Sequence, residues 1–349
     1  MGQQERQDRV LSQGNQRNSN IELLRLLCVL LIVSMHVFGL YSSHLGLSGL
    51  LALSFNNTIG NLGVSVFMLI SGYFGIRFRL SKLLGLWNVA WFWSVVLAFV
   101  VADFSSSALV HAFFPILTDK YWFLTAYMVI FCLSPFIESL VHAITRRQFL
   151  WLIGVLALFF VVAPTLLKFE ITSDSGKGVV NMMTVYLIGR YMALYGLPRW
   201  TVGLRGAVLL AVVVVMVTVF DFILSVYTGT LFQLFARDNS IFMLLGAIAL
   251  FCCAAQLKPC SIPWINQLAG YVFPIYVIHV SLLPLAPALP ASAHDVLYLV
   301  VWAFTIGLSL LAIVLELLRR GLLTKAFNGL LEAELSLSHR ISKTMLKWT

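Results

Sequence analysis

Two ionisable side chains share one face of the first apolar segment, which reads NIELLRLLCVLLIVSMHVFGL over residues 20–40. Arg25 and His36 are eleven residues apart, a little more than three helical turns, so both lie on one stripe of a helix. At 1.5 Å rise per residue they are about 16 Å apart, roughly half the hydrocarbon thickness of a bilayer. Glu22 falls near the same stripe. Ionisable groups inside an apolar span are costly, so the pattern indicates a functional site.

These side chains suit different chemistry. A neutral imidazole at His36 can take the proton from a hydroxyl that attacks an acyl group, a contribution of about 10²- to 10⁴-fold. The planar fork of Arg25 suits a phosphate on a cytosolic cofactor. Each residue also has a plainer interpretation. The histidine could be satisfied by a backbone carbonyl or a serine, and the arginine could simply extend its head to the membrane surface.

A second basic group follows the second apolar segment. Arg77, Arg79 and Lys82 come directly after FMLISGYFGI, on the side of the membrane expected for Arg25. They could bind the same polyanion as Arg25. They could equally be the ordinary basic residues of a cytoplasmic loop.

Three further ionisable residues lie within later apolar segments. His279, near the middle of its segment, could help to position a substrate. Asp221 and Glu316 are acids at membrane depth, and each could pair with a base such as Arg190 or orient a histidine.

Two aromatic residues, Tyr121 and Trp122, stand at the start of another apolar segment. Their ordinary role would be an aromatic belt at the outer membrane surface, but the same rings could contact a sugar or a lipid headgroup.

No metal site is predicted, because the histidines lie on separate segments without ligand spacing and no cysteine pairs with them. Glycine-rich phosphate loops and GxSxG elbows are also absent from the sequence.

The composition indicates which elements must position these residues. Of 349 residues 60% are hydrophobic and only 11% charged, and the mean hydropathy is +0.94. A soluble domain carries about a quarter charged residues, so the fold expected is an all-α, polytopic integral membrane protein. Apolar runs of about 20 residues favour helices over the short alternating strands of a barrel. The net charge of +9 is not taken as a sign of nucleic-acid binding, because the basic residues sit in short loops between spans.

About ten transmembrane helices are predicted, within three regions. Residues 1–19 form a polar cytoplasmic tail, residues 20–320 form the transmembrane domain, and residues 321–349 form a cytoplasmic, amphipathic and basic tail. The expected spans are 21–40, 59–76, 86–103, 121–140, 149–167, 179–195, 206–228, 240–256, 268–286 and 296–318.

The distribution of lysine and arginine predicts the orientation. With both termini in the cytoplasm, only Lys120, Lys168, Lys177 and Arg237 of the loop residues face outward. A multi-pass protein of the cell inner membrane is therefore expected.

Four segments together resemble membrane acyltransferase family 3. They are NIELLRLLCVLLIVSMHVFG with its Arg-x10-His spacing, FMLISGYFGI with the basic loop after it, YWFLTAYMVIFCLSPFIE, and PIYVIHV. They occur in the family's order and cover residues 20–320. The resemblance implies an O-acyltransferase that moves an acyl group, usually acetyl, from cytoplasmic acyl-CoA to a hydroxyl of a cell-surface glycan or a lipid-linked saccharide.

The same resemblance implies roles for particular residues. His36 would be the catalytic histidine, Arg25 would lie on the CoA side, and Arg77 and Arg79 would stand for the family's cytoplasmic arginine cluster. The supporting candidates are Glu22, Tyr121, Trp122, His279 and Glu316. The co-substrate would be acetyl-CoA, the partners would be the saccharide acceptor and the lipid bilayer, and neither a metal nor nucleic acid is expected.

A different class of protein remains as the alternative. A proton-coupled transporter of a small anion or glycolipid could use His36, His279, Asp221 and Glu316 as a proton relay. A non-catalytic membrane scaffold is a third interpretation.

Overall fold

The computed structural model describes residues 17–42, 46–101, 105–118, 120–286 and 297–345, and these form helices without any strand. The all-α prediction is thereby confirmed. Most of the predicted 1–19 tail and the last four residues of the 321–349 tail lie outside the described residues. The helices are α2 (Ser19–Gly39), α3 (Leu47–Phe74), α4 (Leu80–Val101), α5 (Ser106–Phe113), α6 (Trp122–Ala143), α7 (Arg146–Ala157), α8 (Ala163–Leu167), α9 (Val179–Tyr195), α10 (Leu204–Thr228), α11 (Ile241–Ala255), α12 (Pro263–Leu268), α13 (Val272–Leu282) and α14 (Leu297–Met345).

All ten expected spans coincide with helical segments. Within the described ranges, eight helical stretches are long and apolar enough to cross a membrane; α7 and α8 form one of them, as do α12 and α13. The other two expected spans are shorter helices, with 17 residues in α9 and 15 in α11. The chain is a polytopic helical membrane protein, and its described residues hold eight full-length candidate spans.

One boundary was predicted wrongly. The second span was expected to start at residue 59 after a polar loop, but α3 begins at Leu47. Four of the polar residues that suggested a loop, Ser54, Asn56, Asn57 and Thr58, are instead buried inside the bundle. Ser34 of α2 donates a hydrogen bond to Asn56 at 3.2 Å, and Thr58 donates to the Ser54 carbonyl at 2.9 Å. These contacts satisfy polar groups within a helix that crosses the membrane.

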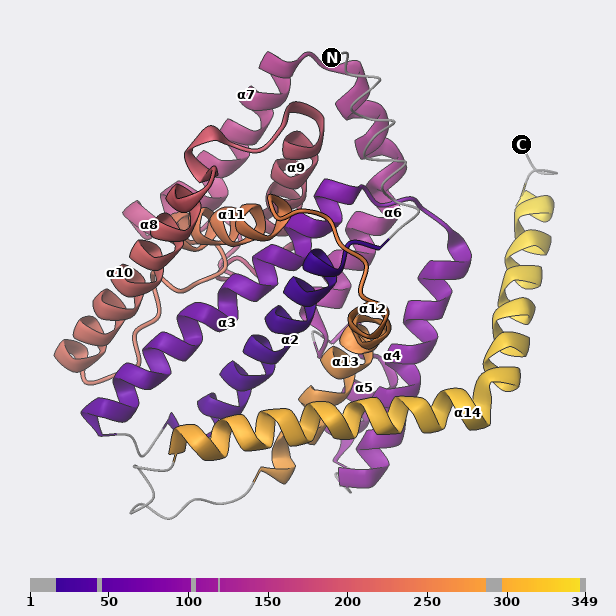
Figure 1. Cartoon of the computed structure of the whole chain (residues 1–349). Coiled ribbons are helices and arrows are strands. Elements are labelled where there is room, and N and C mark those ends of the chain that lie inside the picture. Colours follow the sequence, from indigo (N-terminus) through magenta and orange to yellow (C-terminus); the bar gives the residue numbers. More distant parts are fainter. Residues whose placement is uncertain (1–16, 43–45, 102–104, 119, 287–296, 346–349) are drawn as a thin grey trace.

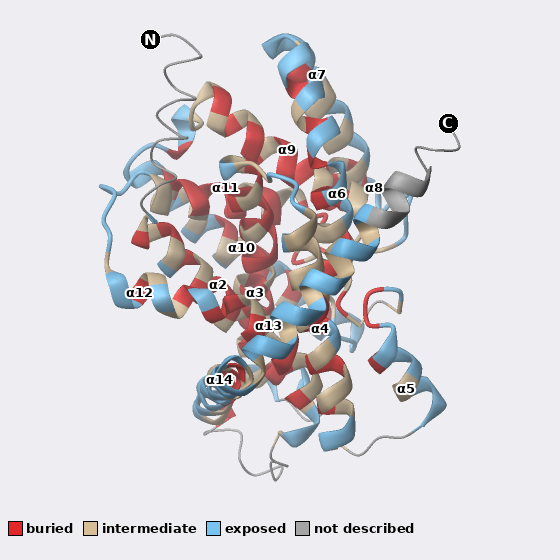
Figure 2. Cartoon of the chain, turned by 90° about the vertical axis from the view of Figure 1, so that its right-hand side faces the viewer, coloured by how far each residue is buried: buried red, intermediate tan, exposed pale blue. Residues whose placement is uncertain are grey.

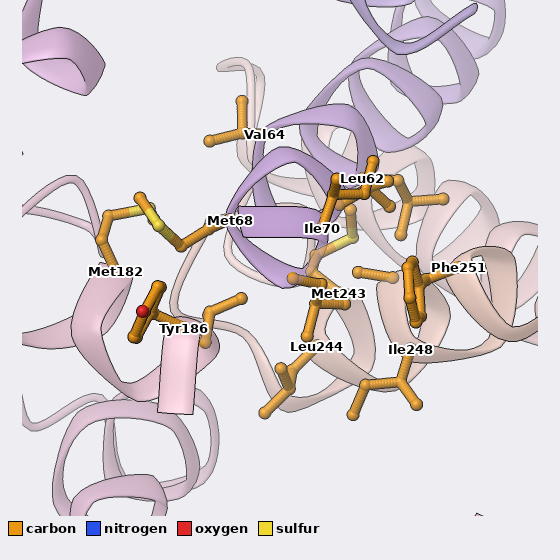
Figure 3. Packing of buried hydrophobic residues seen from close by; sticks show 14 of the residues in the cluster. Leu62, Val64, Met68, Ile70, Met182, Tyr186, Met243, Leu244, Ile248 and Phe251 are labelled. Carbon is orange, nitrogen blue, oxygen red and sulfur yellow. The ribbon is translucent and has the colours of Figure 1, made fainter. Parts of the chain in front are cut away.

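Helix α3 forms the centre of the bundle and packs against α2, α9, α10 and α11 (Figure 1). Its apolar side chains contact neighbours on both sides. In Figure 3, Met68 lies beside Met182 and Tyr186 of α9, while Met243 and Phe251 of α11 lie on the other side. A central helix with such neighbours provides a firm support for any site on its surface.

Glycine allows α3 to approach its neighbours closely, as is usual for helices packed in a membrane. A Cβ atom built at Gly72 would lie 2.0 Å from the Tyr186 carbonyl oxygen of α9. From the α9 side, a Cβ at Gly189 would lie 2.4 Å from the Leu69 carbonyl oxygen. The two backbones therefore touch, and neither position has room for a side chain.

Replacing Gly72 by alanine is therefore expected to destabilise the protein by about 1–3 kcal/mol, the usual cost of overpacking. The measurement is the thermal unfolding midpoint in detergent, followed by size-exclusion chromatography after heating. Gly154→Ala is the matched control, because no atom lies within 4 Å of a Cβ at that helical position. Equal midpoints for the two variants would contradict the close α3–α9 contact.

The exposed surface is strongly apolar. Figure 2 shows buried residues gathered along α3 and α13 and exposed ones along α5, α7 and α14. Large hydrophobic side chains such as Leu204 and Leu299 lie on the outside, at 78% and 72% exposure. Such residues suit a surface that faces lipid.

The α10–α11 loop, residues 229–240, is tied to the bundle. The Asp221 carboxylate accepts hydrogen bonds from the backbone N–H groups of Phe235 and Ala236 at 3.2 and 3.0 Å. Asn61 of α3 donates to the Ala236 carbonyl at 2.7 Å. Asp221 thus fixes a loop, and the expectation that it pairs with a base or orients a histidine is wrong.

Arg190 pairs with a different acid from the one expected. Its Nε donates to Glu138 of α6 at 2.8 Å, and Nη2 donates to the same carboxylate. The guanidinium packs beside Gly75, the residue at which α3 ends. Gly75 has a φ of +73°, a backbone conformation that glycine adopts without strain. This turn directs the chain toward Arg77.

Helix α14 is continuous from Leu297 to Met345; it packs on α2, α4 and α13 and then turns, as Figure 1 shows. Its second half folds back on α4, where Phe327 lies 5.3 Å from Phe92 between ring centroids. The helix expected in the 321–349 tail is thus present as far as Met345. Its contact with the membrane surface stays a prediction.

Candidate active site

A cavity of about 1540 Å³ runs through the bundle, and its wall holds residues from both ends of α2. This exceeds the roughly 300–1,000 Å³ of a site for one drug-sized ligand, so it has room for two substrates. At the N-terminal end of α2 it is lined by Arg17, Arg25, Arg77 and Lys82, here called the basic mouth. At the other end it is lined by Lys177, Gln233, Arg237 and Asp238, here called the opposite mouth.

The N-terminus of α2 is fastened to the linker that precedes α12. Ser19 accepts a hydrogen bond from the Ile262 N–H at 2.6 Å, and its own N–H donates to the Cys260 carbonyl at 2.8 Å. The Asn18 side chain caps the helix by accepting from the Asn20 N–H. These contacts hold α2 in place at the basic mouth.

Arg25 and Glu22 lie together in the cavity wall, as their spacing predicts. Arg25 Nη1 donates to Glu22 Oε2 at 3.2 Å, and the Arg25 side chain stays 38% exposed. One carboxylate contact leaves most of the five N–H donors of the guanidinium open to the cavity.

The basic residues after α3 divide into two groups. Arg77 and Lys82 line the cavity, whereas Arg79 is exposed and does not line it. The structure therefore brings Arg77 to Arg25 but leaves Arg79 outside. Arg17 also lines the basic mouth, although the sequence placed it in a tail.

His36 meets His279 in the interior. His279 Nε2 lies 3.3 Å from His36 Nδ1, and the ring centroids are 5.2 Å apart. His279 is fully buried, while His36 lines the cavity. Two histidines that are 243 positions apart in sequence thus form one pair.

Hydrogen-bond chemistry assigns the protons of this pair. His279 Nδ1 faces the Ile275 carbonyl at 3.1 Å, and a carbonyl only accepts, so Nδ1 carries the proton. His279 Nε2 then holds a lone pair and accepts from His36 Nδ1–H. His36 also hydrogen-bonds to the backbone of Ile32, one turn earlier in α2. In the tautomer that carries the proton on Nδ1, Nε2 holds a lone pair. The pair presents His36 Nε2 as a base.

Asn57 of α3 lines the cavity at the depth of His36. The register follows from the Ser34–Asn56 hydrogen bond and from Gly60, where a Cβ would lie 2.6 Å from Met35 Cβ. Asn57 is 5% exposed, and its Nδ2 has no hydrogen-bond partner among the described residues. The sequence analysis missed this residue because it placed Asn57 in a loop. An amide donor without a partner, at the depth of a base, can hold developing negative charge.

The two aromatic candidates have different surroundings. Trp122 lines the cavity, and Lys177 Nζ lies 5.8 Å from its ring centroid. Tyr121 is fully buried, with its ring 6.1 Å from that of Tyr276. The expectation of Tyr121 at the membrane surface is wrong, because it packs between helices instead.

Glu316 lies apart from the cavity. Its carboxylate accepts hydrogen bonds from Trp93 at 3.0 Å, from Arg319 at 2.8 and 2.7 Å and from Arg320 at 2.8 Å. It anchors α14 to α4. The structure does not bring it to His36 or His279.

Metal ligation has no candidate residues within the described ranges. No three His, Cys, Asp or Glu side chains gather there as ligands.

Comparison with known proteins gives one match. The model of acyltransferase family 3, described as an acyltransferase domain, matches residues 18–317. This chain belongs to acyltransferase family 3. The family expected from the four segments is confirmed, and the protein is a multi-pass membrane acyltransferase. No curated protein and no solved structure gives a significant match.

Proposed function

We propose that this acyltransferase takes an acyl group, acetyl in the first instance, from cytoplasmic acyl-CoA. The acceptor is a hydroxyl of an extracytoplasmic cell-surface glycan or lipid-linked saccharide, and the protein lies in the inner membrane. One observation carries the proposal: a single cavity has Arg25 and His36 in its wall, with a basic mouth at one end and a polar mouth at the other.

The basic mouth suits the donor. Arg17, Arg25, Arg77 and Lys82 gather positive charge on the side that the distribution of Lys and Arg assigns to the cytoplasm. Phosphates of CoA would bind these cations, with the forks of the arginines giving two-point contacts. The flexible pantetheine arm would then extend along the cavity and bring the thioester to His36.

The histidine pair suits the transfer step. His36 Nε2 takes the proton of the acceptor hydroxyl while the hydroxyl oxygen forms a bond to the thioester carbonyl carbon. The carbonyl oxygen becomes an oxyanion, toward which Asn57 Nδ2 donates a hydrogen bond. When the intermediate collapses, the carbon–sulfur bond breaks and the CoA thiolate takes the proton from His36. The products are the O-acyl ester and free CoA.

Arg25→Ala is expected to raise the KM for acetyl-CoA about 10- to 100-fold with a smaller change in kcat. The reason is the loss of a charged hydrogen bond, worth about 1.5–3 kcal/mol. Release of CoA thiol by protein in proteoliposomes measures both constants. Arg79→Ala is the matched control, because Arg79 lies outside the cavity. An equal rise in KM for both variants would remove Arg25 from the donor site.

The four residues that a transporter would need as a proton relay do not lie together. Asp221 is held by backbone N–H groups, and Glu316 is held by two arginines away from the cavity. Only His36 and His279 of the four proposed members lie together.

A whole-cell experiment tests the proposed function. Deletion of the gene should remove acetyl groups from the surface glycan, as seen by mass spectrometry, and the wild-type gene should restore them. An unchanged glycan, together with no acetyl-CoA turnover by the purified protein, would refute the proposal.

A further inference from the structure

The opposite mouth is built from two loops that are joined to each other. Asn181 Nδ2 donates to the carbonyl oxygens of Gly176 and Asp238, at 2.9 and 3.1 Å. Gly176 has a φ of +87°, and a Cβ there would lie 2.3 Å from the Asn239 nitrogen. The loops therefore meet backbone to backbone. They hold Lys177 and Asp238 in fixed positions at the cavity wall.

Asp238 is buried without a full set of partners. It is 5% exposed, it lines the cavity, and its Oδ1 accepts no hydrogen bond from any residue that the structure describes. It lies in the α10–α11 loop, where burial raises the pKa of its carboxyl group to about 7 while the charge of Lys177 acts in the opposite direction. A buried acceptor that belongs to a residue of the cavity wall and lacks a donor is suited to a ligand that supplies one.

Lys177 is the matching donor. Its ammonium lies over Trp122 and acts electrostatically on both Asp238 and His36. It makes no ion pair with Asp238 or any other acid in the described part of the chain. The neighbouring Arg237, by contrast, is neutralised by Glu170 at 2.8 Å. Among the charged residues of the mouth in the described part of the chain, Lys177 is therefore a cation without an ion pair, and Asp238 is an acceptor without a donor at Oδ1.

The chemistry of these groups selects among ligands. An ammonium only donates hydrogen bonds and a carboxylate only accepts them, whereas a hydroxyl does both. Above the pKa of about 7 of Asp238, where its carboxyl group is ionised, an anion would gain from Lys177 but would be repelled by Asp238. The two charges together then favour an uncharged ligand. Trp122 adds an apolar face of the kind on which the C–H face of a sugar ring packs.

We propose that Trp122, Lys177 and Asp238 form a subsite that holds an uncharged sugar unit of the acceptor and presents its neighbouring hydroxyl to His36. This inference rests on the proposed function. Asp238 accepts from one sugar hydroxyl, Lys177 donates to an oxygen of the same ring, and Trp122 packs against the ring face. The subsite thus determines acceptor specificity, and it excludes uronic acids and phosphorylated sugars.

The test compares two probes that differ by one carboxylate, methyl glucoside and methyl glucuronide. Their affinities for the purified full-length protein are measured by saturation-transfer difference NMR. The wild type should bind the glucoside more tightly. Asp238→Asn keeps the shape of the residue but leaves Lys177 uncompensated, so the affinity ratio should shift toward the glucuronide by about tenfold. Lys177→Gln should shift it the other way.

Two controls make the outcome decisive. Lys168→Gln removes a cation from the same loop at an exposed position that does not line the cavity, and should leave the ratio unchanged. Trp122→Leu should weaken the binding of both probes equally. An unchanged ratio in both Asp238→Asn and Lys177→Gln would overturn the subsite.

Acetyl-CoA turnover separates this inference from the proposed function. If turnover persists while the affinity ratio does not respond, only the subsite is wrong. If the wild type shows no turnover, the proposed function fails, and the NMR result then reports on a saccharide site alone.

Discussion

His36→Ala is expected to reduce acyl transfer by about 10²- to 10⁴-fold, the range for loss of a positioned general base. The residue lines the cavity, and its Nε2 carries the lone pair in the tautomer whose Nδ1–H points toward His279. The KM for acetyl-CoA should change little, because the proposed function places the phosphates at the other end of α2. Single-turnover transfer to an acceptor, measured in proteoliposomes, gives the rate of the chemical step.

Two controls accompany this prediction. His111→Ala removes an exposed histidine of α5 and should leave the rate unchanged. His279→Gln keeps an acceptor for His36 Nδ1–H and should retain more activity than His279→Leu, which leaves that group without a partner. A His36→Ala protein with the wild-type rate would remove His36 from the chemistry. Equal losses in the two His279 variants would show that His279 has only a packing role.

Helical periodicity made the main features of this protein predictable. The Arg25–His36 spacing fixes their shared face before any neighbour is known, because it depends only on helix geometry. The Arg25–Glu22 contact follows in the same way. Apolar length and the charge of the loops predict the spans and their expected orientation.

Periodicity cannot predict which helices become neighbours. The His36–His279 contact joins residues 243 positions apart, and no local pattern in either segment encodes it. For Glu316 the error was the opposite one: the sequence predicted a place in the site, and the residue lies apart from it. An acid at membrane depth suggested the site, but cations one turn along its own helix already satisfy it. Lys177 and Asp238 were passed over because loops have no period from which a common location can be inferred.

Asn57 was missed for a different reason. The run of Ser, Gly and Asn before residue 59 is typical of a loop, and only the bundle shows that these polar side chains face other helices. The leucines at 47, 50, 51 and 53 were the available signal, since their spacing continues the apolar helix toward its true start. With α3 extended, Asn57 comes to the level of His36 on the adjacent helix.

Asn57→Ala is therefore expected to lower kcat by about 10²- to 10³-fold with little change in the KM for acetyl-CoA. This is the usual cost of losing one oxyanion donor. Asn57→Asp should be at least as inactive, because a carboxylate of the same shape cannot donate and repels the oxyanion. Asn56→Ala is the matched control: it is the adjacent buried amide and does not line the cavity. Single-turnover rates normalised to folded protein decide the matter. Equal kcat values in Asn57→Ala and Asn56→Ala would assign Asn57 to packing. Loss of a hydrogen-bond donor that is used only in the transition state lowers kcat and leaves the binding of acetyl-CoA intact.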